Sequence, residues 1–233
     1  MPRSSAVAVD GRLTPADSCV KLHDQHGLWD LTIPGAFSCV RIMQKQAREI
    51  ETRFMPYAES FPPIIGRDPC VLILGSLPGA DSLARGEYYA KPQNAFWRIM
   101  GELVGAGPQL SYPQRRDRLA EGGIALWDVC RSAHREGSLD SAIRDAEPND
   151  VGGLLAAHPS IRRIGFNGRF AETVFIRVIE PSLSLDAAGI TTILLPSTSP
   201  ANAGMSYATK LERWRQALSG AITSLSAEMP DKP

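Results

Sequence analysis

The chain has 233 residues, 43% of them hydrophobic and 21% charged, and its formal net charge is zero. This length suits one α/β domain with an appendage better than two full domains. The balanced charge excludes a surface that is basic over its whole extent. Any site that binds a polyanion must therefore be local. No run reaches the roughly 18 apolar residues of a membrane span, and no signal-peptide segment is evident. We therefore expect a soluble, cytoplasmic protein.

The four cysteines are far apart in the sequence and form neither a Cys-x-x-Cys pair nor a Cys/His cluster: Cys19, Cys39, Cys70 and Cys130. This spacing indicates neither a zinc site nor an iron–sulfur centre. We therefore predict no metal and no other cofactor. Cys70 and Cys130 fall in or beside predicted strands, where we expect buried free thiols.

Residues 1–55 differ from the rest of the chain because their apolar residues follow neither a helical nor a strand period. Only residues 41–54 could form a polar helix, and Met43 and Met55 could serve as alternative starts. We expect residues 1–55 to be an N-terminal extension, partly disordered or loosely packed. The main domain is predicted at 56–228, followed by a tail at 229–233.

Beyond residue 61, buried strands alternate with helical patterns. Strands are predicted at 70–75, 123–127, 162–166 and 191–195, and helices near 94–105, 113–121, 150–157 and 168–179. This alternation predicts a three-layer α/β/α sandwich with a central four-stranded parallel sheet. Ser206 is expected to cap a closing helix whose apolar stripe packs in the core, formed by Leu211, Trp214, Leu218 and Ile222.

The segments that follow the four predicted strands should meet, because the carboxyl ends of parallel strands lie at one edge of a sheet. These segments are 75–79, 128–138, 166–169 and 196–203. The stretch that begins with the first of these segments and runs to residue 97 contains an unusual number of polar and aromatic residues. We therefore expect the functional site there.

Several of these segments carry recognisable motifs. Gly-Ser-Leu-Pro-Gly spans 75–79 and is followed by Tyr89-Ala90 and by Pro-Gln-Asn-Ala-Phe-Trp at 92–97. Further along are Gly-Ile-Ala-Leu-Trp-Asp-Val at 123–129, Phe-Asn-Gly at 166–168 and Leu-Pro-Ser-Thr-Ser-Pro-Ala-Asn-Ala at 195–203.

In this order and spacing, the motifs resemble those of the uracil-DNA glycosylase superfamily, and most closely its branch of DNA-deoxyinosine (hypoxanthine-DNA) glycosylases. The resemblance covers roughly residues 60–220. It implies a uracil-DNA glycosylase-like fold and a monomeric, monofunctional, metal-free enzyme. Such an enzyme flips a deaminated base out of DNA and hydrolyses its N-glycosidic bond, which leaves an abasic site. Hypoxanthine in deoxyinosine is the implied lesion.

Two departures from the superfamily pattern support that branch. Leu77 stands where relatives carry an Asn or Asp that positions the attacking water, and Ser197 stands where many carry His. In the deoxyinosine branch, the Asn of Pro-x-Asn-x-Phe-Trp is taken to be catalytic, so the resemblance assigns that role to Asn94. The residues alone leave another function open, because Asn94 could cap the helix that starts at Ala95.

The resemblance also implies base-binding residues. Tyr89 aligns with the aromatic residue that stacks on the flipped base, and Asn167 would read the base edge, with Leu77 and Ser76 beside it. Alternatively, Tyr89 and its neighbour Tyr88 could pack against the core, and Asn167 could adopt a left-handed turn. Phe96 and Trp97, at the start of a helix, are expected in the core.

Contacts with the DNA backbone are expected from main-chain N–H groups and hydroxyls of the two main loops: Gly75, Pro78, Gly79, Ser82, Ser197, Ser199, Pro200, Ala201 and Asn202. Met205 could be a wedge that fills the vacated space, or a core or exposed methionine. Seven cations near these loops are candidate phosphate contacts or scattered solvated charges: Arg85, Lys91, Arg98, Arg131, Arg135, Arg169 and Lys210. His134 could act as an acid or base, or be an exposed loop histidine.

Other functions remain open at the level of the sequence. A related enzyme could prefer uracil or xanthine. The losses at Leu77 and Ser197 would also suit a lesion-binding module without catalysis. A serine hydrolase or P-loop nucleotidase is disfavoured, because the chain lacks Gly-x-Ser-x-Gly and a full Walker motif.

Overall fold

The structure is a computed structural model that describes residues 20–24, 27–31, 55–183, 185 and 189–222. It divides into two units, Met1–Phe54 and Met55–Pro233. In the first unit, β1 (Val20–Asp24) pairs antiparallel with β2 (Gly27–Leu31). The sequence pattern predicted no strand here, and that prediction was wrong for these two segments. The predicted helix at 41–54, Met43, Cys19, Cys39 and the tail at 229–233 lie outside the described residues.

The second unit is built on a four-stranded sheet with the order β5-β4-β8-β9. All neighbouring strands in it run parallel. The strands are β4 (Val71–Gly75), β5 (Ile124–Asp128), β8 (Arg163–Asn167) and β9 (Thr191–Leu195). The predicted parallel sheet is confirmed, with every strand within one residue of its expected place.

The central strand β4 explains why the sheet must be covered on both faces. Val71 and Ile73 belong to one buried apolar cluster, whereas Leu72 and Leu74 belong to another. Successive side chains of a strand point to opposite faces, and all four of these are fully buried. An uninterrupted apolar strand of this kind is typical of a parallel sheet between two helical layers.

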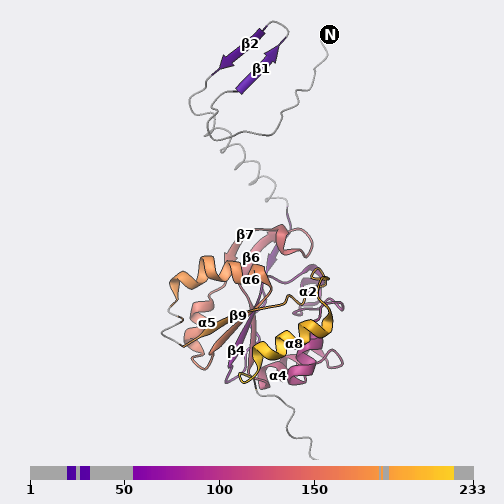
Figure 1. Ribbon diagram of the computed structural model, residues 1–233. Helices are drawn as coiled ribbons and strands as arrows, with labels where there is room; N and C mark the ends of the chain where they lie inside the picture. The colour runs from indigo at the N-terminus through magenta and orange to yellow at the C-terminus, as the bar shows by residue number, and fades with distance from the viewer. Residues whose placement is uncertain (1–19, 25–26, 32–54, 184, 186–188, 223–233) are drawn as a thin grey trace, which may run out of the picture. The chain divides into compact units, whose positions relative to one another are not determined.

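Helices provide those two layers (Figure 1). α3 (Phe96–Val104), α4 (Tyr112–Glu121) and α8 (Tyr207–Leu218) contribute to the cluster on one face. α5 (Val151–Ala157) and α6 (Arg169–Val174) contribute to the other, and a π-helical turn (Phe175–Ile179) and a 3-10 turn (Glu180–Ser182) continue α6. The predicted α/β/α sandwich is therefore confirmed. A short helix that was not predicted, α2 (Ala80–Arg85), follows the loop at residues 75–79, which is called the first loop below.

The closing helix α8 also follows its prediction. The Ser206 hydroxyl accepts a hydrogen bond from the Thr209 amide at 3.1 Å, which satisfies an otherwise unpaired N–H at the helix start. Trp214 and Leu218 are fully buried. Leu211 and Ile222 are partly buried against the same cluster, so the stripe belongs to the core.

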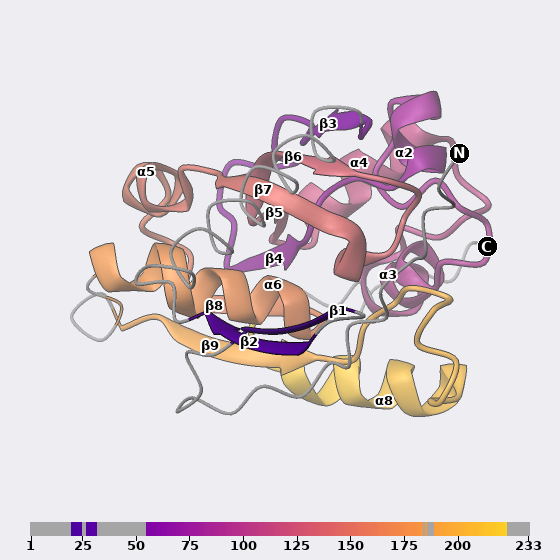
Figure 2. The ribbon, with the colours of Figure 1, turned by 90° about the horizontal axis from the view of Figure 1, so that it is seen from above.

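A second sheet was not predicted. It contains β3 (Tyr57–Glu59), β6 (Cys130–Arg135) and β7 (Ile143–Pro148), which pair antiparallel in the order β3-β6-β7 and lie together in Figure 2. A 3-10 turn, Asp140–Ala142, lies between β6 and β7. The sequence analysis treated 128–138 as a loop, and this was wrong for β6. Cys-Arg-Ser-Ala-His-Arg has no clear apolar alternation, so its pairing depends on distant residues.

Both cysteines of the described chain are free thiols. Cys130 is buried as expected, but Cys70 is partly exposed, so the expectation of burial was wrong for Cys70. Among the described residues, no helix is long and apolar enough to cross a membrane. The same part of the chain contains no group of three or more His, Cys, Asp or Glu side chains placed to hold a metal ion.

Candidate functional site

A cavity of about 570 Å³ opens at the carboxyl ends of the parallel strands. This volume lies in the range of about 300–1,000 Å³ that is typical of small-molecule sites. Its walls include residues 75–79, 81 and 82 at and beyond the end of β4, residues 138–141 between β6 and β7, and residues 197–202 after β9. All predicted site residues except Met205 line it: Gly75, Ser76, Leu77, Pro78, Gly79, Ser82, Tyr89, Asn94, Asn167, Ser197, Ser199, Pro200, Ala201 and Asn202.

Asn167, at the end of β8, ties two of these walls together. Its Nδ2 donates to the Tyr89 hydroxyl and to Thr198 Oγ1, both at 2.9 Å. Its Oδ1 accepts from the Thr198 amide at 2.9 Å. The positive φ of 105° belongs to Gly168, so a left-handed turn at Asn167 was the wrong alternative. Both ends of the amide are engaged within the protein, and base reading by Asn167 stays a prediction.

Tyr89 has one ring face covered and the cavity beside it. It stacks on Phe96 with ring centroids 4.2 Å apart and an interplanar angle of 23°. Its backbone has a φ of 53°, in the left-handed region that residues with side chains seldom adopt. Burial and the nearby Asp128 carboxyl raise the pKa of the Tyr89 hydroxyl, although the hydrogen bond from Asn167 lowers it. A flat, neutral aromatic surface is therefore fixed at the cavity wall.

The neighbouring Tyr88 is mainly a core residue. Only 2% of it is exposed. Its hydroxyl donates to the Phe61 carbonyl at 2.9 Å, and its own carbonyl accepts from Trp97 Nε1 at 2.8 Å. The expected core positions of Phe96 and Trp97 are confirmed by exposures of 0% and 3%.

Asn94 makes the capping contact that the sequence analysis considered and also lines the cavity, while its catalytic role stays a prediction. Its Oδ1 accepts from the Phe96 amide at 3.0 Å, which is a capping contact at the start of α3. The Ala95 amide donates to the Thr198 carbonyl at 3.0 Å, so this turn is joined to the loop after β9. Asn94 also lines the cavity, and its Nδ2 has no hydrogen-bond partner within the described part of the chain. The cap holds the side chain and leaves an N–H donor available.

Asp128 is a lining residue that was absent from the predicted site set. It ends β5 beside Gly75, where an added Cβ would lie 2.5 Å from Asp128 Oδ1 and 2.8 Å from the Tyr89 hydroxyl. Ser60 Oγ donates to its Oδ2 at 3.1 Å. Burial raises the pKa of Asp128 to about 7, with a contribution from Asp140, while Ser60 and Arg135 lower it. Its place directly after the strand predicted at 123–127 was the signal available in the sequence.

Arg135 supports the first loop by hydrogen bonds to its main chain. Only 4% of it is exposed, and its guanidinium donates to the Leu77 carbonyl at 3.1 Å and to the Pro78 carbonyl. Burial lowers the pKa of this guanidinium, while Asp140 and Asp128 raise it. Both suggestions for Arg135, a phosphate contact and a scattered solvated charge, were therefore wrong. Its two bonds explain how a loop with a buried Leu77 keeps its shape.

Other predicted cations also have structural partners. Lys210 is 6% exposed, its pKa is lowered by burial, and its Nζ donates to the Asn202 carbonyl at 2.8 Å. It supports the loop after β9, so both suggestions for it, a phosphate contact and a scattered solvated charge, were wrong. Arg131 pairs with Glu147, and the Arg98 guanidinium lies 3.9 Å from the Tyr207 ring centroid. Lys91 lines the cavity.

His134 is neither in a loop nor at the cavity. It lies in β6 and is half-buried, with Nδ1 3.1 Å from the Met55 carbonyl oxygen. Its ring packs edge-on against Tyr57, with centroids 5.3 Å apart. Both suggestions for this residue, an acid or base in the site and an exposed loop histidine, were wrong.

Serine hydroxyls around the cavity accept hydrogen bonds from nearby amides. Ser82 Oγ accepts from the Ala90 amide at 3.2 Å. Ser197 Oγ accepts from the Ser199 amide at 3.3 Å, and Ser199 Oγ accepts from the Ala201 amide at 3.3 Å. A hydroxyl that accepts in this way keeps its O–H free to donate. Their role as phosphate ligands stays a prediction.

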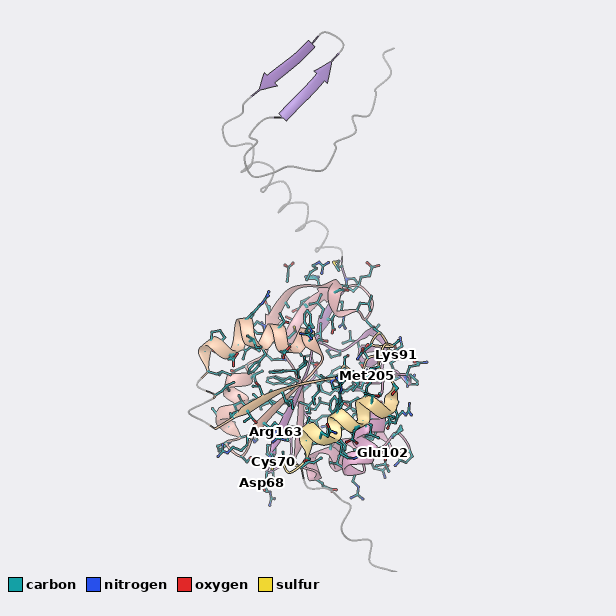
Figure 3. All side chains as sticks on the ribbon, viewed as in Figure 1. Asp68, Cys70, Lys91, Glu102, Arg163 and Met205 are labelled. Atoms are coloured by element: carbon teal, nitrogen blue, oxygen red, sulfur yellow. The ribbon has the colours of Figure 1, made fainter. Side chains whose placement is uncertain are left out.

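A second cavity, of about 620 Å³, adjoins the first and shares Ser197 and Asn202 with it. It follows the edge strand β9 and includes Arg169 and Arg213, which form no ion pair with another described residue. Met205 is half-buried and lines neither cavity. Figure 3 shows it on the same side of the domain as Lys91, away from Cys70 next to the start of β4.

Comparison with known proteins identifies the family. The sequence profile of the uracil DNA glycosylase superfamily matches residues 62–218, which is more than half of the chain and includes every residue that lines the two cavities. The chain belongs to the uracil DNA glycosylase superfamily.

Superfamily relatives agree with this assignment. A protein named hypoxanthine DNA glycosylase from Methanosarcina acetivorans is 41% identical over 143 residues, which cover 61% of this chain and 86% of the relative. One of the same name from Methanosarcina barkeri is 38% identical over 145 residues, covering 62% and 87%. A solution NMR structure from M. acetivorans, provisionally described as a uracil DNA glycosylase, is 36% identical with a TM-score of 0.58. It covers 70% of this chain and 99% of that one.

Proposed function

We propose that this superfamily member is a DNA glycosylase that releases hypoxanthine from deoxyinosine in DNA and leaves an abasic site. Two relatives at about 40% identity carry the name hypoxanthine DNA glycosylase, and the alignment covers most of their length. The substrate is then DNA with a deaminated base. The choice of hypoxanthine over uracil or xanthine rests on those relatives and on the residues at two loop positions, Leu77 and Ser197.

One observation carries the proposal: an aromatic wall and an unpaired amide donor face the same cavity. Tyr89 is backed by Phe96, fixed by Asn167 and lines the cavity, so its ring is a rigid surface on which a planar ligand could stack. An extruded base loses its stacking in the duplex, and stacking on an aromatic residue returns roughly 1–3 kcal/mol. Asn94 Nδ2 is the donor at this cavity.

The amide suits the chemistry of N-glycosidic hydrolysis. As the bond between the sugar and the base breaks, its electron pair goes to the base, water adds its oxygen to the sugar, and a water proton ends on the released base. A hydrogen bond from Asn94 Nδ2 stabilises the negative charge that develops on the base. The capping bond to Phe96 holds the amide in place before reaction, so little reorganisation is needed.

The buried Leu77 affects the same step. Only 5% of it is exposed, it packs in the core cluster, and its side chain cannot hold a water molecule. Charge stabilisation on the leaving base therefore carries more of the rate acceleration than water activation from this loop. The amide of Asn94 is therefore the group on which the rate of base release should depend most.

The test is single-turnover release of free base from matched duplexes that contain deoxyinosine, deoxyuridine or deoxyxanthosine. We expect the fastest release from deoxyinosine. Asn94→Ala should lower this rate by orders of magnitude. Asn94→Asp keeps an oxygen for the Phe96 amide but removes the N–H donor, so it should keep the stability and lose the rate. A rate near that of the wild type in Asn94→Asp contradicts the donor role.

A second candidate function is a lesion-binding module without catalysis. Leu77 and Ser197 favour it, because both positions lack the polar groups that relatives use. Such a protein would bind a deoxyinosine duplex but release no base at any protein concentration. Release that increases with protein concentration under single-turnover conditions excludes this function.

A further inference from the structure

Leu139 is a large apolar side chain exposed at the mouth of the cavity. It is 57% exposed, and it lines the cavity in the segment between β6 and β7. Its neighbours in this wall are polar: Ser138, Asp140 and Ser141. A single exposed leucine is ordinary on a protein surface. This one differs because it lies at the opening through which a flipped base must pass.

The residues on both sides of Leu139 are attached to the first loop. Ser138 Oγ accepts from the Ala80 amide at 3.2 Å. On the other side, Asp140 Oδ1 accepts from Ser76 Oγ at 2.6 Å. The Leu139 carbonyl accepts from the Ala142 amide at 3.1 Å, which closes the turn behind it. Leu139 is thus held at a fixed place beside residues 75–80 while its side chain remains open to solvent.

This arrangement fits the requirement of base extrusion. When a nucleotide leaves the duplex, its neighbours lose stacking partners and an apolar gap remains. Proteins that kink or open DNA commonly insert an apolar side chain into such a gap. Because the main chain at this position is already held in place, little backbone freedom is lost on insertion.

We propose that Leu139 enters the duplex at the position vacated by the flipped nucleotide and keeps the base in the cavity. This inference rests on the proposed function. Met205 is the other apolar candidate, but it is half-buried and lines neither cavity. Leu139 therefore acts as a positioning residue from the segment between β6 and β7, and not from the loop after β9 in which a wedge was expected.

The experiment compares Leu139→Ala with the wild type on two substrates, deoxyinosine in a duplex and the same oligonucleotide as a single strand. A wedge matters only where a stacked, paired base must be extruded. We therefore expect single-turnover base release from the duplex to fall by about tenfold, equivalent to roughly 1.4 kcal/mol. Release from the single strand should stay unchanged.

Three further variants sharpen the comparison. Leu139→Met replaces one large apolar side chain with another and should restore the duplex rate. Ile176→Ala removes a comparably exposed apolar side chain, 49% exposed and outside both cavities, and should leave both rates unchanged. Met205→Ala should also lack the duplex-specific loss.

Several results would overturn the inference. No loss in Leu139→Ala, or an equal loss on both substrates, excludes a wedge at this position. A duplex-specific loss in Met205→Ala alone places the wedge in the loop after β9 instead. If the wild type releases no base from either substrate, the proposed function fails and this inference fails with it.

Discussion

Asn94, Tyr89 and Asn167 show how few atoms define the site at the level of residues. A single amide nitrogen of Asn167 bonds to the Tyr89 hydroxyl, and the amide oxygen of Asn94 bonds to a main-chain N–H of α3. These bonds are internal, but each one orients a group that faces the cavity. Substitutions can remove the whole Tyr89 ring, only its hydroxyl, or the Asn94 amide. They can therefore show which groups contact the ligand and which only orient their neighbours.

We expect Tyr89→Ala to weaken binding to a duplex with a non-hydrolysable deoxyinosine analogue by roughly 1–3 kcal/mol, because the stacking surface is lost. Tyr89→Phe keeps the ring on Phe96 and loses only the bond from Asn167. It should therefore bind nearly as well as the wild type. Fluorescence anisotropy titrations measure both. Equal losses in the two variants would show that the hydroxyl, and not the ring, is the important group.

Asp128 links the site to pH. Its pKa is about 7 in the folded protein, above its ordinary value of 3.8, mainly because of burial. Between these values the folded protein binds a proton that the unfolded chain does not. The free energy of unfolding therefore falls as pH rises through this window, by up to about 1.4 kcal/mol per pH unit from this one group, and the contribution is constant above about pH 7.

Asp128→Asn should abolish that dependence, since it cannot ionise. We expect the variant to gain stability relative to the wild type as the pH is raised from 5 to 8. Urea unfolding of both proteins at each pH measures the difference. The other groups that face Asp128, which are Ser60, Arg135 and Asp140, are shared by both proteins. A difference in stability that does not change with pH would place the pKa of Asp128 outside this window.

At the level of elements, the second cavity is a groove that runs along the edge strand β9 and helix α8, beside the main cavity. Arg169 starts α6 and Arg213 lies on α8, and both line this groove. The main cavity, by contrast, is lined by three carboxyl side chains and one lysine: Asp81, Asp128, Asp140 and Lys91. Cations that hold the phosphates beside a flipped nucleotide are therefore better placed in the groove than in the cavity.

We expect Arg169→Ala and Arg213→Ala each to reduce the dependence of log K on log salt concentration by about one. The affinity for lesion and undamaged duplexes should fall by similar factors, because phosphates carry no base information. Arg177→Ala is a suitable control, since this arginine is exposed and lines neither cavity. Titrations at several salt concentrations measure the slopes. An unchanged slope in both variants would remove the groove from the DNA path.

At the level of the whole molecule, the site belongs to one unit of the chain. The residues that line both cavities lie within Met55–Pro233. A protein that begins at Met55 should therefore unfold cooperatively and release hypoxanthine at the rate of the full chain. Single-turnover assays and thermal unfolding of both proteins measure this. A large loss of rate with unchanged stability would show that residues 1–54 contribute to DNA binding or catalysis.

Local pattern was sufficient for the main sheet and for the place of the site. Val71–Gly75 and the other three strands are short apolar runs between turn residues, and the loops after parallel strands must meet at one edge. The resemblance to the superfamily then gave candidate site residues, and fourteen of these line the cavity. The pattern failed for β6 and β7, whose polar strands are stabilised by each other and by β3.

From sequence alone, this chain could be recognised as a parallel α/β protein with polar loops at the carboxyl edge of its sheet, since apolar periodicity and turn residues are local properties. The roles of individual charges depended on the folded chain. Arg135 and Lys210 became buried supports of loop carbonyls, and Asp128 became a cavity carboxyl with a raised pKa. Burial and hydrogen-bond partners arise from contacts between distant segments. These contacts determine the pKa of each of the three side chains and which groups it can bind.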